Sequence, residues 1–408
     1  MKKNYLILYP NPFTKFNYFK YEISYLKKET NINKVIIHDL SRIVLKENFY
    51  REWKTKLEKK TIKFYSLFSW IKIFLSYQKE KFLIINFVKM TNLESLIINF
   101  LVKFSNHTII EHSPANVFRS IKPSKKNYSF FLSRIKQHKF NLNVYLFGLK
   151  NYMYNFILNI IETKKKFILT NDFKKISYKY KEHSKKKIIQ VNFNSYDYSN
   201  SLLAKKIKNK KKKYILYVDN GAPYFSGDAN FKGDSVQYFG NIKNYYTDLN
   251  NFFNKLEKYF NTEVIIIPHP KYKSYSKKIK SLNPFFKNRQ VNNDHNALPK
   301  LTPNCLFFIQ KHSTAISFPI FFKKPILLIY SSKQKYARGE QSSLLHLSKI
   351  LGKKPTDIVN FSKFSIQKSL KININEYEKF KYKYLTPKNK SILNTPNYKI
   401  LNKLTSEV

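Results

Sequence analysis

Polar residues that could take part in chemistry follow short apolar runs in the second half of the sequence. His269 follows the run 263–267, and the His-Ser-Thr sequence at 312–314 follows the run 305–309. Apolar, β-branched runs that stop abruptly at polar residues are typical of buried parallel strands. Because ligands of open α/β sheets bind outside the carboxyl ends of such strands, we expect a site at His269 and 312–314.

His269 is held in a rigid stretch of backbone. Pro270 follows it, and a proline restricts the preceding residue to the extended region. A fixed imidazole at a strand end can donate a hydrogen bond to a phosphate oxygen or transfer a proton. The alternative interpretation is that His269 only caps the helix expected after it.

His312, Ser313 and Thr314 lie between an expected strand and an expected helix. The hydroxyl and N–H groups of Ser313 and Thr314 would then face the point where a helix N-terminus stabilises an anion. The alternative is ordinary N-capping by Ser313, which needs only one such residue. A second helix N-terminus is expected after His269 on the same sheet, and the two together favour a phosphate or diphosphate site.

Asp219 is a candidate general base. It follows another apolar run and precedes Asn220 and Gly221. A carboxylate at a strand end could deprotonate an acceptor hydroxyl, whereas the alternative is a turn, which Asp-Asn-Gly favours. Glu111 and His112 follow a strand in the first half of the chain and are the second candidates for acid or base.

Strand and helix patterns alternate along the chain, which indicates parallel α/β layers. The expected strands are 5–9, 34–38, 82–87, 107–111, 167–170, 187–191, 214–218, 263–267, 288–292, 305–309 and 325–330. The expected helices are 16–30, 49–78, 93–104, 128–161, 245–260, 272–281, 295–301, 314–322, 341–351 and 375–384. We therefore expect an α/β protein with two Rossmann-like domains that face a cleft.

A shift in composition divides these domains. Residues 1–195 form the first domain, 196–213 a basic linker, 214–386 the second domain, and 387–408 a tail expected to pack on the first domain. The run 205–213 is almost entirely basic, and we interpret it as a solvated connector in preference to a binding patch.

The net charge of +51 arises from 76 Lys and Arg against 25 Asp and Glu. Most of the cations are lysines spread along the chain, which a compositional bias toward Lys, Asn, Ile, Phe and Tyr would produce without selection. The functional alternatives are attraction to anionic lipids or to an anionic substrate, and, as a lesser alternative, to nucleic acid. No signal peptide or membrane-spanning segment is visible. We expect a cytoplasmic protein, peripheral on the inner face of the cell membrane.

The single cysteine, Cys305, excludes disulfides within the chain and any metal site built from several cysteines. No Asp-x-Asp motif follows a strand, so we expect no metal. Histidine, hydroxyl groups and helix dipoles would then neutralise a phosphate.

Four short motifs occur in order along the second domain. They are Asp219-Asn220-Gly221, His269-Pro270, His312-Ser313-Thr314-Ala315 and Lys324-Pro325-Ile326. In this order they resemble the bacterial sialyltransferases and polysialyltransferases, and the related glycosyltransferases of capsule and lipooligosaccharide biosynthesis with GT-B architecture. The resemblance covers about 214–330. Asn220 stands where that group has a second acidic residue, and Thr314 where it often has a second serine.

The resemblance implies an inverting glycosyltransferase whose second domain binds the donor and whose first domain faces the acceptor. It implies that Asp219 is the base, that His269 contacts the donor phosphate, and that Ser313 and Thr314 bind the same phosphate. The implied donor is a CMP-activated nonulosonic acid such as sialic acid, with a glycan or glycolipid acceptor and no cofactor.

Two alternatives remain open. One is a transferase of another nucleotide-activated sugar or of a polyol phosphate. The other is a basic nucleic-acid-binding protein, which would need a contiguous Lys and Arg surface interleaved with exposed aromatic residues.

Overall fold

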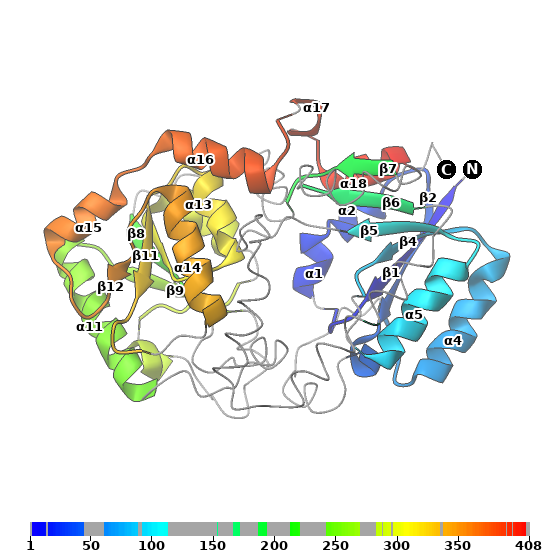
Figure 1. Cartoon of the computed structure of the whole chain (residues 1–408), viewed down its shortest axis with the longest axis horizontal. Coiled ribbons are helices and arrows are strands. Elements are labelled where there is room, and N and C mark those ends of the chain that lie inside the picture. The colour runs from blue at the N-terminus through cyan, green and yellow to red at the C-terminus, as the bar shows by residue number, and fades with distance from the viewer. Residues whose placement is uncertain are drawn as a thin grey trace.

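The computed structural model shows two parallel sheets, which lie in separate lobes (Figure 1). It describes residues 2–13, 15–44, 61–88, 92–112, 153, 166–171, 187–193, 213–220, 242–269, 283–287, 289–294, 297–334, 338–388, 390–393 and 395–404. The expected linker, 196–213, lies outside the described residues except for Lys213.

Within the described residues, the first sheet has seven parallel strands. They are β1 (Lys3–Tyr9), β2 (Ile32–Asp39), β3 (Thr61–Lys63), β4 (Phe82–Asn86), β5 (Thr108–His112), β6 (Lys166–Thr170) and β7 (Lys187–Gln190), in the order β3-β2-β1-β4-β5-β6-β7. Side chains of β1 alternate between two cores: Tyr5 and Ile7 face one, and Leu6 and Leu8 face the other. Both faces of this sheet are therefore covered, which explains why its strands are apolar throughout.

Helices cover each of these faces. The face of Tyr5 and Ile7 packs against α2 (Ile23–Leu26) and α18 (Asn397–Leu404). The face of Leu6 and Leu8 packs against α4 (Leu67–Ser76) and α5 (Leu93–Phe104). Among the helices that the structure describes, none is both long and apolar enough to cross a bilayer.

The second sheet has five described parallel strands. They are β8 (Tyr214–Val218), β9 (Val264–Ile267), β10 (Cys305–Gln310), β11 (Ile326–Tyr330) and β12 (Thr356–Asp357), in the order β12-β11-β10-β8-β9. One face packs on α11 (Ile242–Phe260) and α15 (Lys363–Leu370). The opposite face packs on α12 (Ala297–Leu301), α13 (Ser317–Phe321), α14 (Arg338–Leu351) and α16 (Ile374–Phe380).

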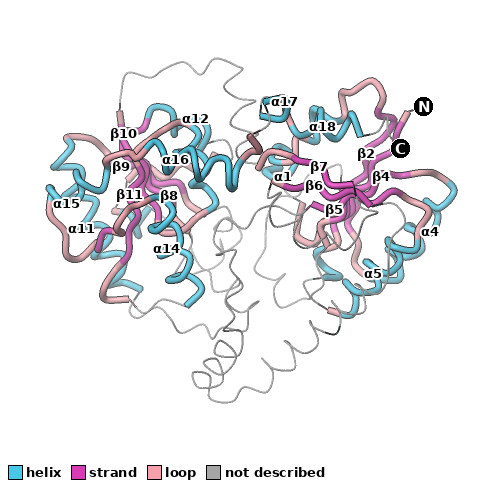
Figure 2. The backbone as a smooth tube through the Cα atoms, turned by 45° about the horizontal axis from the view of Figure 1, so that its top comes forward, coloured by secondary structure: helices cyan, strands magenta, loops and turns pink. Residues whose placement is uncertain are grey.

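The C-terminal segment returns from the second lobe to the first (Figures 1 and 2). After α16 comes a π-helical turn, Lys381–Leu385, and then α17 (Lys390–Leu393) and α18. Thr386 Oγ1 donates to Asn192 Oδ1 at 2.7 Å, and the Tyr5 hydroxyl donates to the Leu401 carbonyl at 3.1 Å. The helix α18 is thus part of the first lobe.

The expected α/β fold class with two domains is confirmed, and the other expected strands are present. The expected strand 288–292 is wrong, because its described residues form only a single bridge between Ile266 and Val291. The expected helix 16–30 is wrong: it is divided into α1 (Lys15–Lys20) and α2 by Glu22, whose φ is 53°. Within the expected helix 49–78 the chain instead forms β3 before α4. The expected helices 128–161, apart from Met153, and 272–281 lie outside the described residues.

Candidate active site

The C-terminal ends of β8, β9 and β10 lie side by side in the second sheet. Val218, the last residue of β8, pairs with Ile267 of β9 on one side and with Gln310 of β10 on the other. Asp219 follows Val218 directly, and His269 comes two residues after Ile267. Neighbouring strands are about 4.8 Å apart, so the sheet brings these strand ends together.

The sheet order makes the gap between β8 and β10 a topological switch point. From β8 the chain continues to β9 on one side, and it then crosses to β10 on the other side. Ligands of open α/β sheets bind at such a point, outside the carboxyl ends of the strands. Asp219 lies on one side of the switch point, and residues 311–314 lie on the other.

Asp219 is buried at the end of β8. Its N–H donates to the Ile267 carbonyl at 3.0 Å, and its Oδ1 accepts a hydrogen bond of 3.3 Å from the Tyr217 hydroxyl. Burial raises the pKa of Tyr217 well above its usual range, so Tyr217 stays protonated and can only donate to this carboxylate. Both contacts fix the orientation of Asp219. Gly221 lies outside the described residues, so the turn interpretation is not tested.

Ser313 caps the turn that follows β10. Its Oγ accepts a hydrogen bond of 3.2 Å from the Ala315 N–H, and its carbonyl accepts one of 3.1 Å from the Ile316 N–H. The first turn, Thr314–Ile316, is a 3₁₀ helix, and only the five residues of α13 follow it. The capping interpretation of Ser313 is therefore observed. Because these two N–H groups are engaged, an anion here would depend more on side chains than on the helix N-terminus.

His269, His312 and Thr314 also lie at the ends of β9 and β10. Both histidines are half-buried, and Thr314 is exposed. His269 follows the buried Pro268, while Pro270 lies outside the described residues. The imidazoles thus stand at the rim of the strand ends, where a partly enclosed ligand could contact them.

Two buried polar residues at the end of β10 were not predicted as site residues from the sequence. Gln310 is fully buried, and neither atom of its amide has a hydrogen-bond partner among the described residues. Lys311, next to it, is also buried. An unsatisfied buried polar group costs about 1–3 kcal/mol, and a native structure that retains one needs a reason for it. The available signal was a glutamine and a lysine that end an otherwise apolar strand.

The second candidates lie in the other sheet. Glu111 and His112 end β5, where Glu111 pairs with Asn86 of β4 and Ile168 of β6. The Glu111 side chain is half-buried. The structure therefore brings Asp219, Asn220, His269, His312, Ser313 and Thr314 to one sheet end and leaves Glu111 and His112 in the first lobe. Within the described segments, no three His, Cys, Asp or Glu side chains come together as metal ligands would.

Comparison with known proteins shows the architecture. No protein-family model matches the sequence, and neither does any curated protein. A solved structure of the wall teichoic acid polymerase TagF, soaked with CDPG, is similar over 99% of this chain and 89% of its own, with a TM-score of 0.51 and 12% identity. The chain has the GT-B fold.

Two further solved structures match across the whole of this chain with TM-scores below 0.5. The UDP-GlcNAc 2-epimerase of Methanocaldococcus jannaschii matches at 10% identity with a TM-score of 0.46 and is itself covered completely. The UDP complex of S. aureus MnaA matches at 13% identity with a TM-score of 0.47 and is covered over 97%. At 12% identity, the similarity to TagF establishes the fold alone.

Proposed function

We propose that the protein transfers an activated unit from a nucleotide donor to a cell-surface glycan acceptor. The main support is the grouping of Asp219, His269 and 312–314 around the switch point between β8 and β10 of a GT-B fold. That arrangement offers a carboxylate, imidazoles and a hydroxyl at the position where such sheets bind ligands.

The donor is a cytidine nucleotide. The motif resemblance implies a CMP-activated nonulosonic acid such as sialic acid. The TagF structure, whose TM-score is above 0.5, was soaked with CDPG, that is CDP-glycerol. Both lines of support share the cytidine nucleotide and differ in the group transferred. A CMP-linked nonulosonic acid is the first candidate, and a CDP-linked polyol phosphate is the second.

The chemistry assigns a role to each group. Asp219 accepts the proton of an acceptor hydroxyl while that oxygen forms a bond to the donor. In glycosyl transfer the bond between the anomeric carbon and the phosphate oxygen breaks, and its electron pair leaves with CMP. In polyol-phosphate transfer, the acceptor oxygen bonds to phosphorus and CMP again leaves. His269 and Thr314 donate hydrogen bonds to the departing phosphate, so its charge is stabilised without a metal.

Nucleotide binding provides the first test. A ligand that binds only the folded state at roughly 100 times its Kd stabilises that state by about 2.7 kcal/mol. We expect CMP and CDP to raise the melting temperature of the purified protein, and UDP and GDP to leave it unchanged. A response to UDP or GDP alone would overturn the cytidine donor.

Transfer activity provides the second test. We expect the protein to consume CMP-sialic acid or CDP-glycerol, and the variants His269→Ala and Asp219→Asn to lose this activity while keeping their melting temperatures within a few degrees. His346→Ala is the matched control, because His346 is a half-buried histidine on α14 of the same lobe. Equal loss in the His346 variant, or full activity in the His269 variant, would contradict the assigned site.

A further inference from the structure

Two helices on the outer side of the first lobe expose apolar side chains to solvent. α4 and α5 lie next to each other in both views, on the side of the lobe that faces away from the second lobe (Figures 1 and 2). Their C-terminal ends are joined where the Asn106 N–H donates to Gln78 Oε1 at 3.4 Å. The inner sides of both helices pack in the core, where Trp70 and Phe74 of α4 and Val102 of α5 are buried.

The outward stripe of α4 is apolar where a helix at a protein surface usually carries polar residues. Phe68 is 79% exposed and Leu75 is 51% exposed, and Tyr65, just before the helix, is 64% exposed. The spacing 65, 68, 72, 75 follows one side of a helix. Lys72 occupies the remaining position of this stripe and is exposed.

The outward stripe of α5 repeats this pattern. Leu93, Phe100 and Phe104 are exposed, at a spacing of seven and then four residues, and Phe104 is 62% exposed. The rings of Phe100 and Phe104 contact each other with centroids 4.4 Å apart. Only Glu94 and Lys103 are charged in the twelve residues of this helix. The two stripes together form what we call the outer apolar face, defined by Tyr65, Phe68, Leu75, Leu93, Phe100 and Phe104.

Cations border the outer apolar face. Arg42 lies over the Tyr65 ring with its guanidinium carbon 4.6 Å from the centroid, and the Lys63 ammonium lies 5.5 Å from the same centroid. The acid nearest the end of α4, Glu80, is already paired with Lys34 at 2.7 Å. The border of the face therefore carries a net positive charge, in a chain whose net charge is +51.

We propose that the outer apolar face seats the protein on an anionic lipid bilayer, with α4 and α5 in the plane of the headgroups. Helices that lie in a membrane interface combine aromatic and leucine side chains on one side with basic residues around them, and anionic headgroups attract such basic residues. The inference goes beyond the proposed function, because it holds for either donor. It would also place the enzyme at the surface where a glycolipid acceptor lies.

The same observations disfavour two other occupants. A second copy of the chain would press this face against itself, since the commonest dimers are twofold and bring identical patches together, and its basic border would then repel. A nucleic acid would need a groove dense in lysine and arginine, whereas the two stripes contain one lysine, Lys72, among six apolar side chains.

Co-sedimentation of the full chain with vesicles tests the proposal. We expect binding to phosphatidylcholine vesicles with roughly 30% phosphatidylglycerol, weaker binding to phosphatidylcholine alone, and loss of binding at about 0.5 M NaCl. The double variant Phe68→Gln/Phe104→Gln should bind at least roughly tenfold more weakly. Both side chains are exposed, so the melting temperature and the response to nucleotides should not change.

A matched control distinguishes vesicle binding by the outer apolar face from binding by any exposed apolar side chain. Phe364 is 75% exposed on α15 of the second lobe, and Phe364→Gln should bind vesicles as the natural chain does. Phe68→Trp, with Trp53 and Trp70 replaced by Phe, should show a blue shift of its fluorescence on anionic vesicles.

Three outcomes would overturn the proposal. The first is vesicle binding that the double variant retains. The second is a concentration-dependent dimer in solution that the double variant loses, with no lipid binding by either protein. The third is a salt-sensitive RNA or DNA complex that the double variant loses, again with no lipid binding.

Discussion

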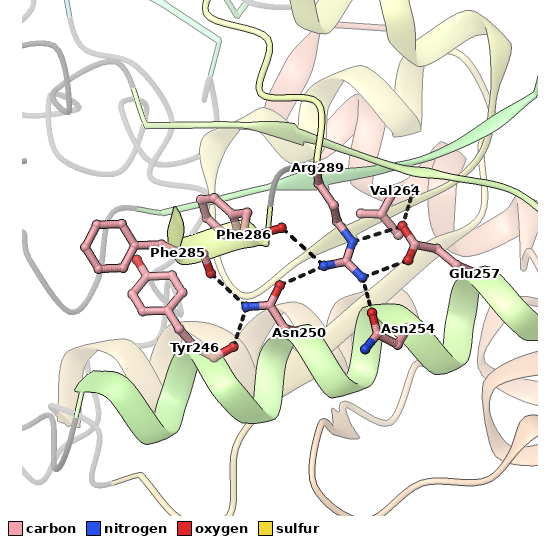
Figure 3. Close-up of polar contacts among 8 residues, drawn as sticks. All are labelled: Tyr246, Asn250, Asn254, Glu257, Val264, Phe285, Phe286 and Arg289. Atoms are coloured by element: carbon pink, nitrogen blue, oxygen red, sulfur yellow. Dashed lines mark hydrogen bonds and ion pairs between the residues drawn. The ribbon is translucent and has the colours of Figure 1, made fainter. Parts of the chain in front are cut away.

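The strongest test of how the second lobe is held together concerns Arg289. Each of its five N–H groups has an acceptor (Figure 3). Nε and Nη2 donate to the two carboxylate oxygens of Glu257 at 2.9 and 2.7 Å. Nη1 donates to Asn250 Oδ1 at 2.7 Å and to the Phe286 carbonyl at 3.2 Å, and Nη2 also donates to Asn254. Arginine is the only amino acid whose side chain has five N–H donors in a planar fork.

This cluster joins the elements behind the candidate site. Glu257 on α11 also accepts a hydrogen bond of 3.0 Å from the N–H of Val264, the first residue of β9. Beside Arg289, the Gln290 carbonyl accepts a hydrogen bond of 2.9 Å from the Ile266 N–H. Arg289 therefore fixes α11 and β9 relative to each other, and β9 leads to His269.

Arg289→Met should be the most damaging variant. The side chain of Arg289 is 9% exposed and that of Glu257 is 27% exposed. Breaking a buried ion pair by removing one partner costs about 3–5 kcal/mol, and the partial exposure of Glu257 places the expected loss near the lower end, about 3 kcal/mol. Arg289→Lys keeps the charge but loses the fork, and we expect it to cost about 2 kcal/mol. The double variant Arg289→Met/Glu257→Gln should cost clearly less than the sum of the single variants, because no charge is left unpaired.

Urea unfolding can follow the two lobes separately. Both tryptophans, Trp53 and Trp70, belong to the first half of the chain, so tryptophan fluorescence reports the first lobe, while far-UV circular dichroism reports both. With an m value of about 1–3 kcal/mol/M, Arg289→Met should lower the midpoint of the second-lobe transition by about 1 M or more and leave the fluorescence transition in place. An equal loss for Arg289→Lys and Arg289→Met would refute the argument from the fork, and a midpoint unchanged in both would refute the role of the cluster.

Three shorter predictions concern single side chains. Gln310→Met should raise the free energy of unfolding by about 1–3 kcal/mol and weaken nucleotide binding, and a variant that is destabilised would contradict an unsatisfied amide. Ser313→Ala should cost about 1 kcal/mol of stability with little effect on nucleotide binding, whereas Thr314→Val should do the reverse, as thermal melts with and without CMP would show. Burial lowers the pKa of His38 to about 3. Below pH 6.5, His38 therefore binds a proton in the unfolded chain but stays neutral in the folded chain. The contribution of neutral His38 to the free energy of unfolding is therefore complete above pH 6.5 and falls as the pH drops toward 3. By pH 5 the free energy of unfolding is lower by about 2 kcal/mol. His38→Gln keeps an acceptor for Trp70 Nε1 and should remove that part of the pH dependence of urea unfolding, which an unchanged pH profile would contradict.

The long strands could be predicted from the sequence because burial on both faces leaves a continuous apolar run. β8 is such a run, and it stops at Val218, where the strand ends, while β4 is apolar from Phe82 to Ile85 and ends one residue later at Asn86. The edge strands β3 and β12 have only three and two residues, too few for any period to be visible. The break between α1 and α2 at Glu22 could not be predicted, because no glycine or proline lies there. Glu22 is buried and has a positive φ.

The position of the candidate site could be predicted, but not the choice between its polar groups. The ends of β8, β9 and β10 were identifiable as polar residues after apolar runs, whereas the order β9-β8-β10 depends on pairings between residues far apart in the chain. Ser313 and Thr314 have the same chemistry whether they cap a turn or bind a phosphate, so residue type alone could not separate the two roles.

The hydrogen bonds of the turn after β10 distinguish the capping role of Ser313 from a phosphate-binding role. Ser313 uses its hydroxyl and its carbonyl to cap the turn. Local structure is therefore enough to explain a serine at this position, and Ser313 is weaker support for a bound ligand than the motif implied. Gln310 is different, because burial without a hydrogen-bond partner among the described residues brings no local benefit. Polar groups that a fold places at a switch point at a cost in stability are better evidence of a site than those that the fold already uses. The better support for a nucleotide site is therefore the buried amide of Gln310 at the end of β10, and not the turn at Ser313.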